Sequence, residues 1–280
     1  MTTYTTPQGI SDYLPNDTKV LNAQIIKLQS LFAKNGFNQI KTPTIEFAEN
    51  LEKGLGPNQK KQSIEFFDPS GNRLLLRPDN TTPIARTVAT RMNTETTPLK
   101  LCYTEPIFRK SNQNHSDTEI FQAGCETFGY TSIENITEII TTCINALEEL
   151  GVTDIGIDIG HINFIDGLSA EKKEALLKGD YITFGKIPER GEAIESNNTD
   201  LTQLVTSLKK TTPSIPIMIN KGLVKGLHYY SGIIFEAYSK HNRNIIASGG
   251  QYDNLCSKFG HDISAVGFAI NLNEIGFQND

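Results

Sequence analysis

Three residues near the middle of the chain have the spacing of a ligand-binding strand. Gln122, Gly124 and Glu126 stand two residues apart within an otherwise mostly apolar stretch, 120–126. Because successive side chains of a β-strand point to opposite faces, these three share one face. Two polar groups and a glycine on such a strand are hard to explain by packing, so the pattern favours a pocket. The alternative for Glu126 is a solvent-facing strand position.

Other familiar catalytic and metal-binding patterns are missing from the sequence. The five histidines, among them His161 and His228, show neither H-x-x-x-H nor H-E-x-x-H spacing, and the four cysteines include no C-x-x-C pair. The absence of these spacings argues against a metal site, a zinc ribbon and a disulfide framework. No phosphate-binding G-x-x-x-x-G-K-[ST] loop or nucleophile elbow is present either. We therefore expect no metal and no cofactor.

Two long amphipathic helices are predicted from apolar residues at helical spacing. The first covers 17–34, with Asp17 as its expected cap and Gly36 as its stop. The second covers 133–150, with Ser132 before it and Gly151 after it. A further helix is expected over 81–92.

Short apolar or alternating runs bounded by Pro, Gly and Asn predict the strands. These runs are 37–41, 64–67, 73–76, 100–103, 120–128, 153–159, 217–219, 232–238, 245–247 and 265–270. The turn residues at 68–72 favour an antiparallel hairpin. Strands grouped around a few helices, without regular strand-helix alternation, indicate an α+β fold with a mostly antiparallel sheet flanked by helices.

We expect a single domain over residues 1–280 with a small, partly helical insertion at about 168–214. Within that insertion, 169–178 and 200–209 have helical patterns, and the polar run 189–199 is too hydrophilic to build a core by itself.

Composition limits the classes of function. The chain has 280 residues, 38% hydrophobic and 21% charged, with a formal charge of -6. This acidic balance disfavours a nucleic-acid partner. Since no apolar run approaches the roughly 18 to 20 residues that span a bilayer, and no secretory leader is evident, we expect no membrane contact and a cytoplasmic location.

The order of several short motifs resembles the histidyl-tRNA synthetases and their paralogues along nearly the entire chain. These motifs are 6–15, 42–46, 76–86, 108–111, 120–126, 223–230, 248–253 and 267–275. The resemblance implies a class II aminoacyl-tRNA synthetase-like catalytic-domain fold. It also implies that copies pair through the motif at 42–46.

The resemblance also implies a histidine-binding pocket. Asp79 would contact the ligand's amino group with Thr81 beside it, Gln122 would help to hold the amino acid, and Glu126 would accept from the imidazole ring. Arg109 matches the family's motif arginine, and Lys225 offers a charge for the ligand carboxylate. Because adjacent strand residues face opposite ways, we expect only one of Tyr229 and Tyr230 to reach the ring, and the resemblance implies that it is Tyr230.

Four positions depart from the synthetase pattern, mostly where the nucleotide or adenylate would bind. Lys225, Gln251 and Glu274 stand where the synthetases have arginine, and Ser111 stands where a glutamate reads adenine. Lysine lacks the planar fork of arginine, and the reversed charge at Glu274 repels a triphosphate. Only nine residues follow Asn271, so the anticodon-binding domain of those enzymes is not expected.

Asp79 and the stretch 157–161 resemble in particular the synthetase-like regulatory subunits of ATP phosphoribosyltransferase. This resemblance implies a subunit with no catalytic residues and no independent activity. Its partners would be the short-form catalytic subunit, a second copy of itself, and L-histidine as feedback inhibitor. Two alternatives stay open: a stand-alone histidine-activating synthetase paralogue, and a tRNA-binding pseudo-synthetase sensor.

Overall fold

The computed structural model describes residues 5–110, 117–192, 198–223, 229–242 and 244–276. Lys225 and Ser111, both singled out in the sequence, therefore lie outside the described residues.

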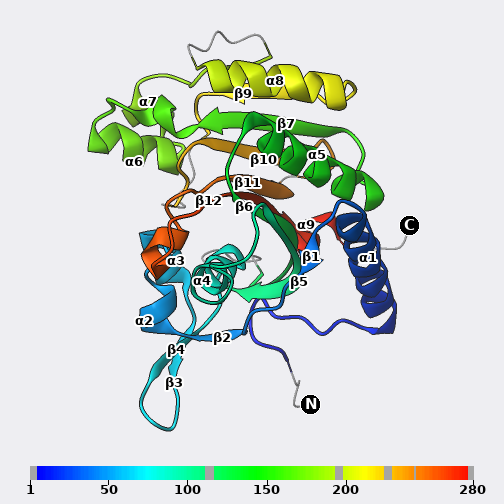
Figure 1. Ribbon diagram of the computed structural model, residues 1–280, viewed down its shortest axis with the longest axis vertical. Coiled ribbons are helices and arrows are strands. Elements are labelled where there is room, and N and C mark those ends of the chain that lie inside the picture. The colour runs from blue at the N-terminus through cyan, green and yellow to red at the C-terminus, as the bar shows by residue number, and fades with distance from the viewer. Residues whose placement is uncertain (1–4, 111–116, 193–197, 224–228, 243, 277–280) are drawn as a thin grey trace.

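A nine-stranded sheet forms the centre of the fold, in the order β1-β5-β6-β12-β11-β10-β7-β9-β8, and a three-stranded sheet has the order β2-β4-β3 (Figure 1). The strands are β1 Asn38–Gln39, β2 Ile45–Phe47, β3 Glu65–Phe67, β4 Arg73–Leu76, β5 Leu99–Phe108, β6 Glu119–Gly129, β7 Ile155–His161, β8 Arg190–Gly191, β9 Ile217–Asn220, β10 Ile233–Ser239, β11 Ala247–Gln251 and β12 Ser264–Asn271. Among the strands of the described residues, only the pairs β1–β5 and β7–β9 are parallel. The predicted α+β fold with a mostly antiparallel sheet is confirmed.

Helices cover both faces of the large sheet. They are α1 Pro15–Lys34, α2 Ala48–Leu51, α3 Pro57–Gln62, α4 Thr81–Arg91, α5 Ile133–Glu149, α6 Ala170–Lys178, α7 Tyr181–Phe184, α8 Thr199–Thr211 and α9 Leu272–Ile275, with 3-10 turns η1 Ile162–Ile165 and η2 Cys256–Phe259. Residues of α1, α5 and α8 pack on one face in the largest core cluster. Residues of α4 and η2 pack on the other face in a second cluster.

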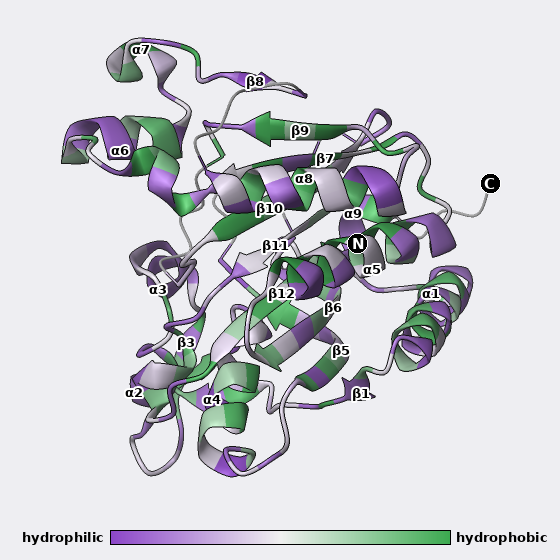
Figure 2. Ribbon diagram, turned by 45° about the horizontal axis from the view of Figure 1, so that its top comes forward, coloured by the Kyte–Doolittle hydropathy of each residue, from purple (hydrophilic) through white to green (hydrophobic). Residues whose placement is uncertain are grey.

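The two long helices follow their sequence signals closely. In α1, Leu21, Leu28 and Phe32 are buried against the sheet, and Figure 2 shows hydrophobic and hydrophilic residues interleaved along this helix. The helix ends before Gly36, whose φ of 80° suits a residue without a side chain. In α5, the Ser132 hydroxyl accepts from the backbone N–H of Asn135, as an N-cap does.

The structure corrects some element bounds. Asp17 is not the N-cap of α1: the helix begins at Pro15, and the Asp17 carboxylate in its first turn accepts from the N–H of Leu14. The strand expected at 245–247 starts only at Ala247 and continues to Gln251, because the glycines at 249 and 250 pair with β12 and β10. The predicted hairpin at 68–72 joins β3 and β4 in an antiparallel pair.

Strand β6 separates the two cores by strict alternation. Ala123 and Cys125 point into the core beneath α5, whereas Phe128 belongs to the core beneath α4. Gln122, Gly124 and Glu126 share the face of Phe128, as their even spacing requires. The sheet therefore presents its polar residues toward α4.

The region 168–214 has two structural parts. Helices α6 and α7 bury Ala175, Leu176 and Phe184 in a small cluster of their own. Helix α8 instead contributes Leu201, Leu204 and Leu208 to the largest core. Within the part of the chain that the structure describes, no helix has both the length and the apolar character needed to cross a bilayer.

Candidate functional site

A cavity of about 230 Å³ lies on the α4 side of the sheet, where β6, β11 and β12 run side by side. Its lining residues come from these strands, the start of α4, the end of β5 and the segment before β10: Asp79, Thr81, Arg109, Gln122, Glu126, Tyr229, Tyr230, Ser248, Gly249, Tyr252, Gly267, Phe268 and Ala269. Seven of the eight residues predicted for the pocket are thus brought together, and Lys225 lies outside the described residues.

Glu126 is a buried carboxyl group at one end of this cavity. Its Oε1 accepts from the Thr81 hydroxyl at 2.8 Å, and its Oε2 accepts from the Tyr252 hydroxyl. Burial raises the pKa of Glu126 to about 8, although the two hydroxyl donors oppose this rise. The solvent-facing alternative for Glu126 is therefore wrong, because the side chain is 1% exposed.

Asp79 is the second buried carboxyl group of the cavity. Its Oδ1 accepts from the backbone N–H of Thr82 at 2.7 Å, and its Oδ2 accepts from the Gln59 amide at 2.5 Å and from the Thr82 hydroxyl. Burial raises the pKa of Asp79, and the positive charge of Arg109 opposes this rise. Asp79 thus satisfies a free N–H at the start of α4 and lines the pocket at the same time.

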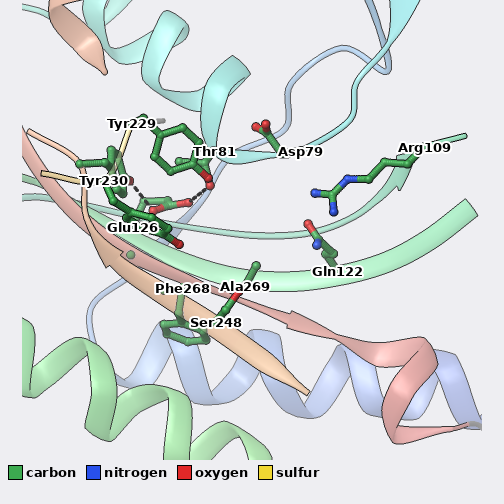
Figure 3. A pocket seen from close by; sticks show the side chains of 13 residues that line it. Asp79, Thr81, Arg109, Gln122, Glu126, Tyr229, Tyr230, Ser248, Phe268 and Ala269 are labelled. Atoms are coloured by element: carbon green, nitrogen blue, oxygen red, sulfur yellow. Dashed lines mark hydrogen bonds between the residues drawn. The ribbon is translucent and has the colours of Figure 1, made fainter. Parts of the chain in front are cut away.

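Arg109 and Gln122 lie at the opposite end of the cavity from Glu126 and the two tyrosines (Figure 3). The Nε of Arg109 donates to the carbonyl of Pro78 at 2.6 Å. This bond ties the end of β5 to the loop that carries Asp79. One end of the cavity therefore has the cation of Arg109 and the amide of Gln122, with the carboxyl group of Asp79 beside them. The other end has the carboxyl group of Glu126 and the two tyrosine rings.

Two glycines leave room for buried side chains near the cavity: Gly267 for Glu126, and Gly124 for Tyr103. A Cβ on Gly267, the partner of Glu126 on β12, would lie 1.6 Å from the Oε2 of Glu126. A Cβ on Gly124 would lie 2.5 Å from the hydroxyl oxygen of Tyr103. Only glycine fits either position while the neighbouring side chains keep their places.

Both Tyr229 and Tyr230 line the cavity, and the expectation that only Tyr230 reaches the ring of a bound histidine stays a prediction. Strand alternation does not apply here, because β10 begins at Ile233 and the two tyrosines precede it. Their rings meet edge to face, with centroids 5.1 Å apart. Together they form one aromatic wall.

Sequence reasoning missed two residues that hold the buried carboxyl groups. Tyr252 follows the glycine-rich strand β11. A buried aromatic hydroxyl normally needs a partner, and this requirement is the signal by which Tyr252 could have been identified. Gln59 is a buried amide in α3, twenty residues before Asp79, and no local pattern relates the two. Only the tertiary fold places that helix beside the pocket.

Two of the positions that depart from the synthetase pattern have structural roles. The Oε1 of Gln251 accepts from the backbone N–H of Ile233 at 2.8 Å. The carboxylate of Glu274 accepts from the amide of Asn244 at 2.9 Å, and Glu274 is not part of the cavity wall. Among the described residues, no group of His, Cys, Asp or Glu side chains has the arrangement of a metal site.

The fold and the pocket together define a class II aminoacyl-tRNA synthetase-like catalytic domain. A family model described as histidyl-tRNA synthetase matches residues 9–180 and 185–275. A solved Bacillus halodurans protein, described as an ATP phosphoribosyltransferase regulatory subunit/histidyl-tRNA synthetase, superposes with a TM-score of 0.87 at 26% identity, over 100% of this chain and 84% of that one. The apo histidyl-tRNA synthetase of S. aureus shares the fold, with a TM-score of 0.73 at 20% identity, over 98% of this chain and 69% of that one.

Curated relatives narrow the assignment. An ATP phosphoribosyltransferase regulatory subunit of Clostridium botulinum (strain Langeland) is 32% identical over 96% of this chain and 74% of the relative. The same subunit of Halothermothrix orenii is 30% identical, with the same coverage of 96% and 74%. The chain belongs to the histidyl-tRNA synthetase-like family of ATP phosphoribosyltransferase regulatory subunits.

Proposed function

We propose that this chain is a non-catalytic subunit that binds and activates the short-form catalytic subunit of ATP phosphoribosyltransferase, the first enzyme of histidine biosynthesis. We further propose that L-histidine in the cavity mediates feedback inhibition of that enzyme. Relatives at about 30% identity carry the regulatory-subunit name, which supports the partnership. Feedback then requires a coupling free energy between the two sites, typically about 1 to 3 kcal/mol.

The cavity's distribution of charge is the observation that carries the histidine proposal. An imidazole ring fits the end formed by Glu126 and the two tyrosines, an ammonium group faces Asp79, and a carboxylate faces Arg109. The volume of about 230 Å³ is below the roughly 300 to 1,000 Å³ of sites for drug-sized ligands. Such a space suits a single amino acid. Lys225 joins this proposal as a second cation for the ligand carboxylate.

The lack of independent catalysis is supported by the positions on the nucleotide side. Gln251 and Glu274, which replace arginines of the synthetases, are engaged in bonds within the chain and offer no positive charge. A triphosphate needs several charge-assisted contacts, and these positions supply none. Histidine binding without activation is the consequence.

A second copy of the chain belongs to the same proposal. On the outer face of the three-stranded sheet, Ile45 pairs with Leu76, and Leu74 pairs with both Phe47 and Phe66. Directly paired residues share a face, so these five apolar side chains form one surface, on which Ile45 and Phe47 are exposed. Such an apolar surface is typical of an interface, and it includes the end of the 42–46 motif.

The expected cytoplasmic location and the absence of a nucleic-acid partner also remain proposals.

The decisive experiment is an assay of the catalytic subunit with and without this chain, over a range of L-histidine concentrations. We expect the native chain to raise the activity and to make it sensitive to histidine. Glu126→Ala should still activate but should lose inhibition by histidine, because the ring would lose its carboxyl partner at this end of the cavity.

The outcome that would refute the proposal is equally specific. If the purified complex gives no heat on titration with L-histidine, and Glu126→Ala leaves inhibition unchanged, the cavity is not the histidine site. If the native chain does not alter the catalytic subunit at all, the regulatory role itself is wrong.

A further inference from the structure

The end of strand β11 lies close to the aromatic wall formed by Tyr229 and Tyr230. A Cβ on Gly250 would lie 3.0 Å from the Cε1 of Tyr230 and 2.4 Å from the carbonyl oxygen of Ile233. A glycine at this position therefore lets the ring, and the segment before β10, approach the strand closely. The residues that follow Gly250 hold that segment in place.

Gln251 holds the backbone of the segment that follows Tyr230. Its carbonyl oxygen accepts from the N–H of Ser231 at 2.9 Å, and its side-chain Oε1 accepts from the N–H of Ile233 at 2.8 Å. A Cβ on Gly232, between these two residues, would lie 2.2 Å from the same Oε1. The segment is thus bound to β11 by both the main chain and the side chain of one residue.

Asp253 holds a side chain of the same segment. The Ser231 hydroxyl donates to the Oδ2 of Asp253 at 2.9 Å, and the N–H of Asp253 donates to the Ser231 hydroxyl oxygen at 2.9 Å. The serine hydroxyl is therefore both donor and acceptor toward one residue, which fixes its orientation. We name these two residues the Ser231–Asp253 pair.

The other carboxylate oxygen of Asp253 is held by two further elements. Its Oδ1 accepts from the hydroxyl of Thr131, in the turn before α5, at 3.2 Å, and from the backbone N–H of Ala265 on β12 at 3.2 Å. Ala265 lies two residues before Gly267, which pairs with Glu126 on β6. The carboxylate thus joins the segment behind the aromatic wall to the strand that leaves room for the buried carboxyl group.

We propose that Ser231 and Asp253 are positioning residues for the pocket, whose paired hydrogen bonds hold Tyr230 and its neighbour Tyr229 in place before a ligand binds. This inference rests on the proposed binding of L-histidine in the cavity. Among the described residues that line the cavity, neither member of the pair is present, so the pair acts on the ligand through the wall. A wall that is already ordered loses less entropy on binding, and this raises the affinity.

The test is Ser231→Ala in the full chain, which removes both bonds of the pair. We expect the Kd for L-histidine, measured by isothermal titration calorimetry, to rise by roughly three- to tenfold, as when one or two side chains must be ordered on binding. Ser231→Thr keeps the hydroxyl and should bind as the native chain does. Ser239→Ala is the matched control and should leave the Kd unchanged. The Ser239 hydroxyl also donates, to the Thr153 carbonyl at 2.9 Å, and accepts, from the N–H of His241 at 3.3 Å, but at the far end of β10.

A second measurement needs no ligand. The chain contains nine tyrosines and no tryptophan, so its near-ultraviolet circular dichroism reports on tyrosine rings in fixed surroundings. We expect the tyrosine band of Ser231→Ala to be weaker than that of the native chain and to recover at saturating L-histidine. Asp253→Asn, which replaces one acceptor oxygen by a donor, should change the band in the same direction, and it serves as the test if Ser231→Ala does not fold. Bonds that contribute stability alone would lower the Tm and leave both the Kd and the spectrum of the folded chain unchanged.

The outcomes separate this inference from the proposed function. If the native chain gives no heat with L-histidine, the histidine proposal fails, and the spectrum alone then decides whether the pair positions the wall: a weaker band in Ser231→Ala supports the inference and a native band overturns it. If the native chain binds L-histidine and Ser231→Ala has the native Kd and spectrum, only the positioning role is overturned. It is also overturned if Ser231→Thr or Ser239→Ala loses as much affinity as Ser231→Ala.

Discussion

Glu126 is a buried carboxyl group, and its protonation contributes to the stability of the fold. Burial raises its folded-state pKa from 4.5 to about 8. Between these two values the native state keeps a proton that the unfolded state has lost. The stability contributed by the protonated group is therefore complete below the unfolded pKa, falls as pH rises, and levels off above about pH 8.

Glu126→Gln removes this dependence, because the amide keeps the size of the side chain but does not ionise. We expect the free energy of unfolding of the native chain to fall relative to the variant by on the order of a few kcal/mol between about pH 5 and pH 8. Urea denaturation at a series of pH values measures the difference. Parallel curves for the two proteins would contradict the buried, protonated state of Glu126.

Gln59 does not line the cavity itself, but its amide donates to Asp79, which does. Gln59→Leu removes one donor from a buried carboxylate, which should cost about 1 to 3 kcal/mol of stability and raise the pKa of Asp79 further. Histidine should bind more weakly at neutral pH, as calorimetry would detect. Gln29→Leu is the matched control, since it removes a side-chain amide's 3.0 Å bond to Thr104, which does not line the pocket, and it should leave histidine affinity unchanged.

At the scale of elements, the pocket depends on how closely β12 approaches β6. Gly267 faces Glu126 across this pair, and a Cβ there would overlap the carboxylate. We expect Gly267→Ala to lower stability by about 1 to 3 kcal/mol and to abolish histidine binding, since Glu126 must move. Gly151→Ala, at a position with open space and a φ of 83°, should cost stability through its backbone alone and should bind histidine normally. Equal binding by both variants would show that Glu126 tolerates displacement.

The helices show that local sequence signals predict where a helix begins and ends, whereas long-range packing decides where the helix lies. The spacing of apolar residues and the caps at Ser132 and Gly36 predicted α5 and the end of α1 to within a residue or two. The position of α8 in the largest core was not predicted, because the polar run before it suggested a peripheral segment. Burial of Leu201 and Leu208 depends on which surface the helix meets, and local spacing does not specify that surface.

At the scale of the whole molecule, the chain combines a synthetase-like fold with Gln251 and Glu274 at two positions where the motif resemblance implies arginine in the synthetases. We expect no histidine-dependent exchange between ATP and pyrophosphate by the purified chain, under conditions in which a histidyl-tRNA synthetase gives clear exchange. The physical reason is the lack of arginine at Gln251 and Glu274, whose side chains bond within the chain. Steady exchange that copurifies with the chain would instead support a stand-alone histidine-activating enzyme.

Several features of this protein were readable from its sequence because they depend on near neighbours. They include the alternation that puts Gln122 and Glu126 on one face, the turn between β3 and β4, and the motif order that identifies the family. Other features were settled only by tertiary structure, such as the amide of Gln59 against Asp79, the hydroxyl of Tyr252 on Glu126, and both tyrosines on one wall. The first two contacts join residues that are 20 and 126 positions apart. Backbone periodicity acts over a few residues, whereas the desolvation that protonates Glu126 exists only once distant strands and helices have closed around it.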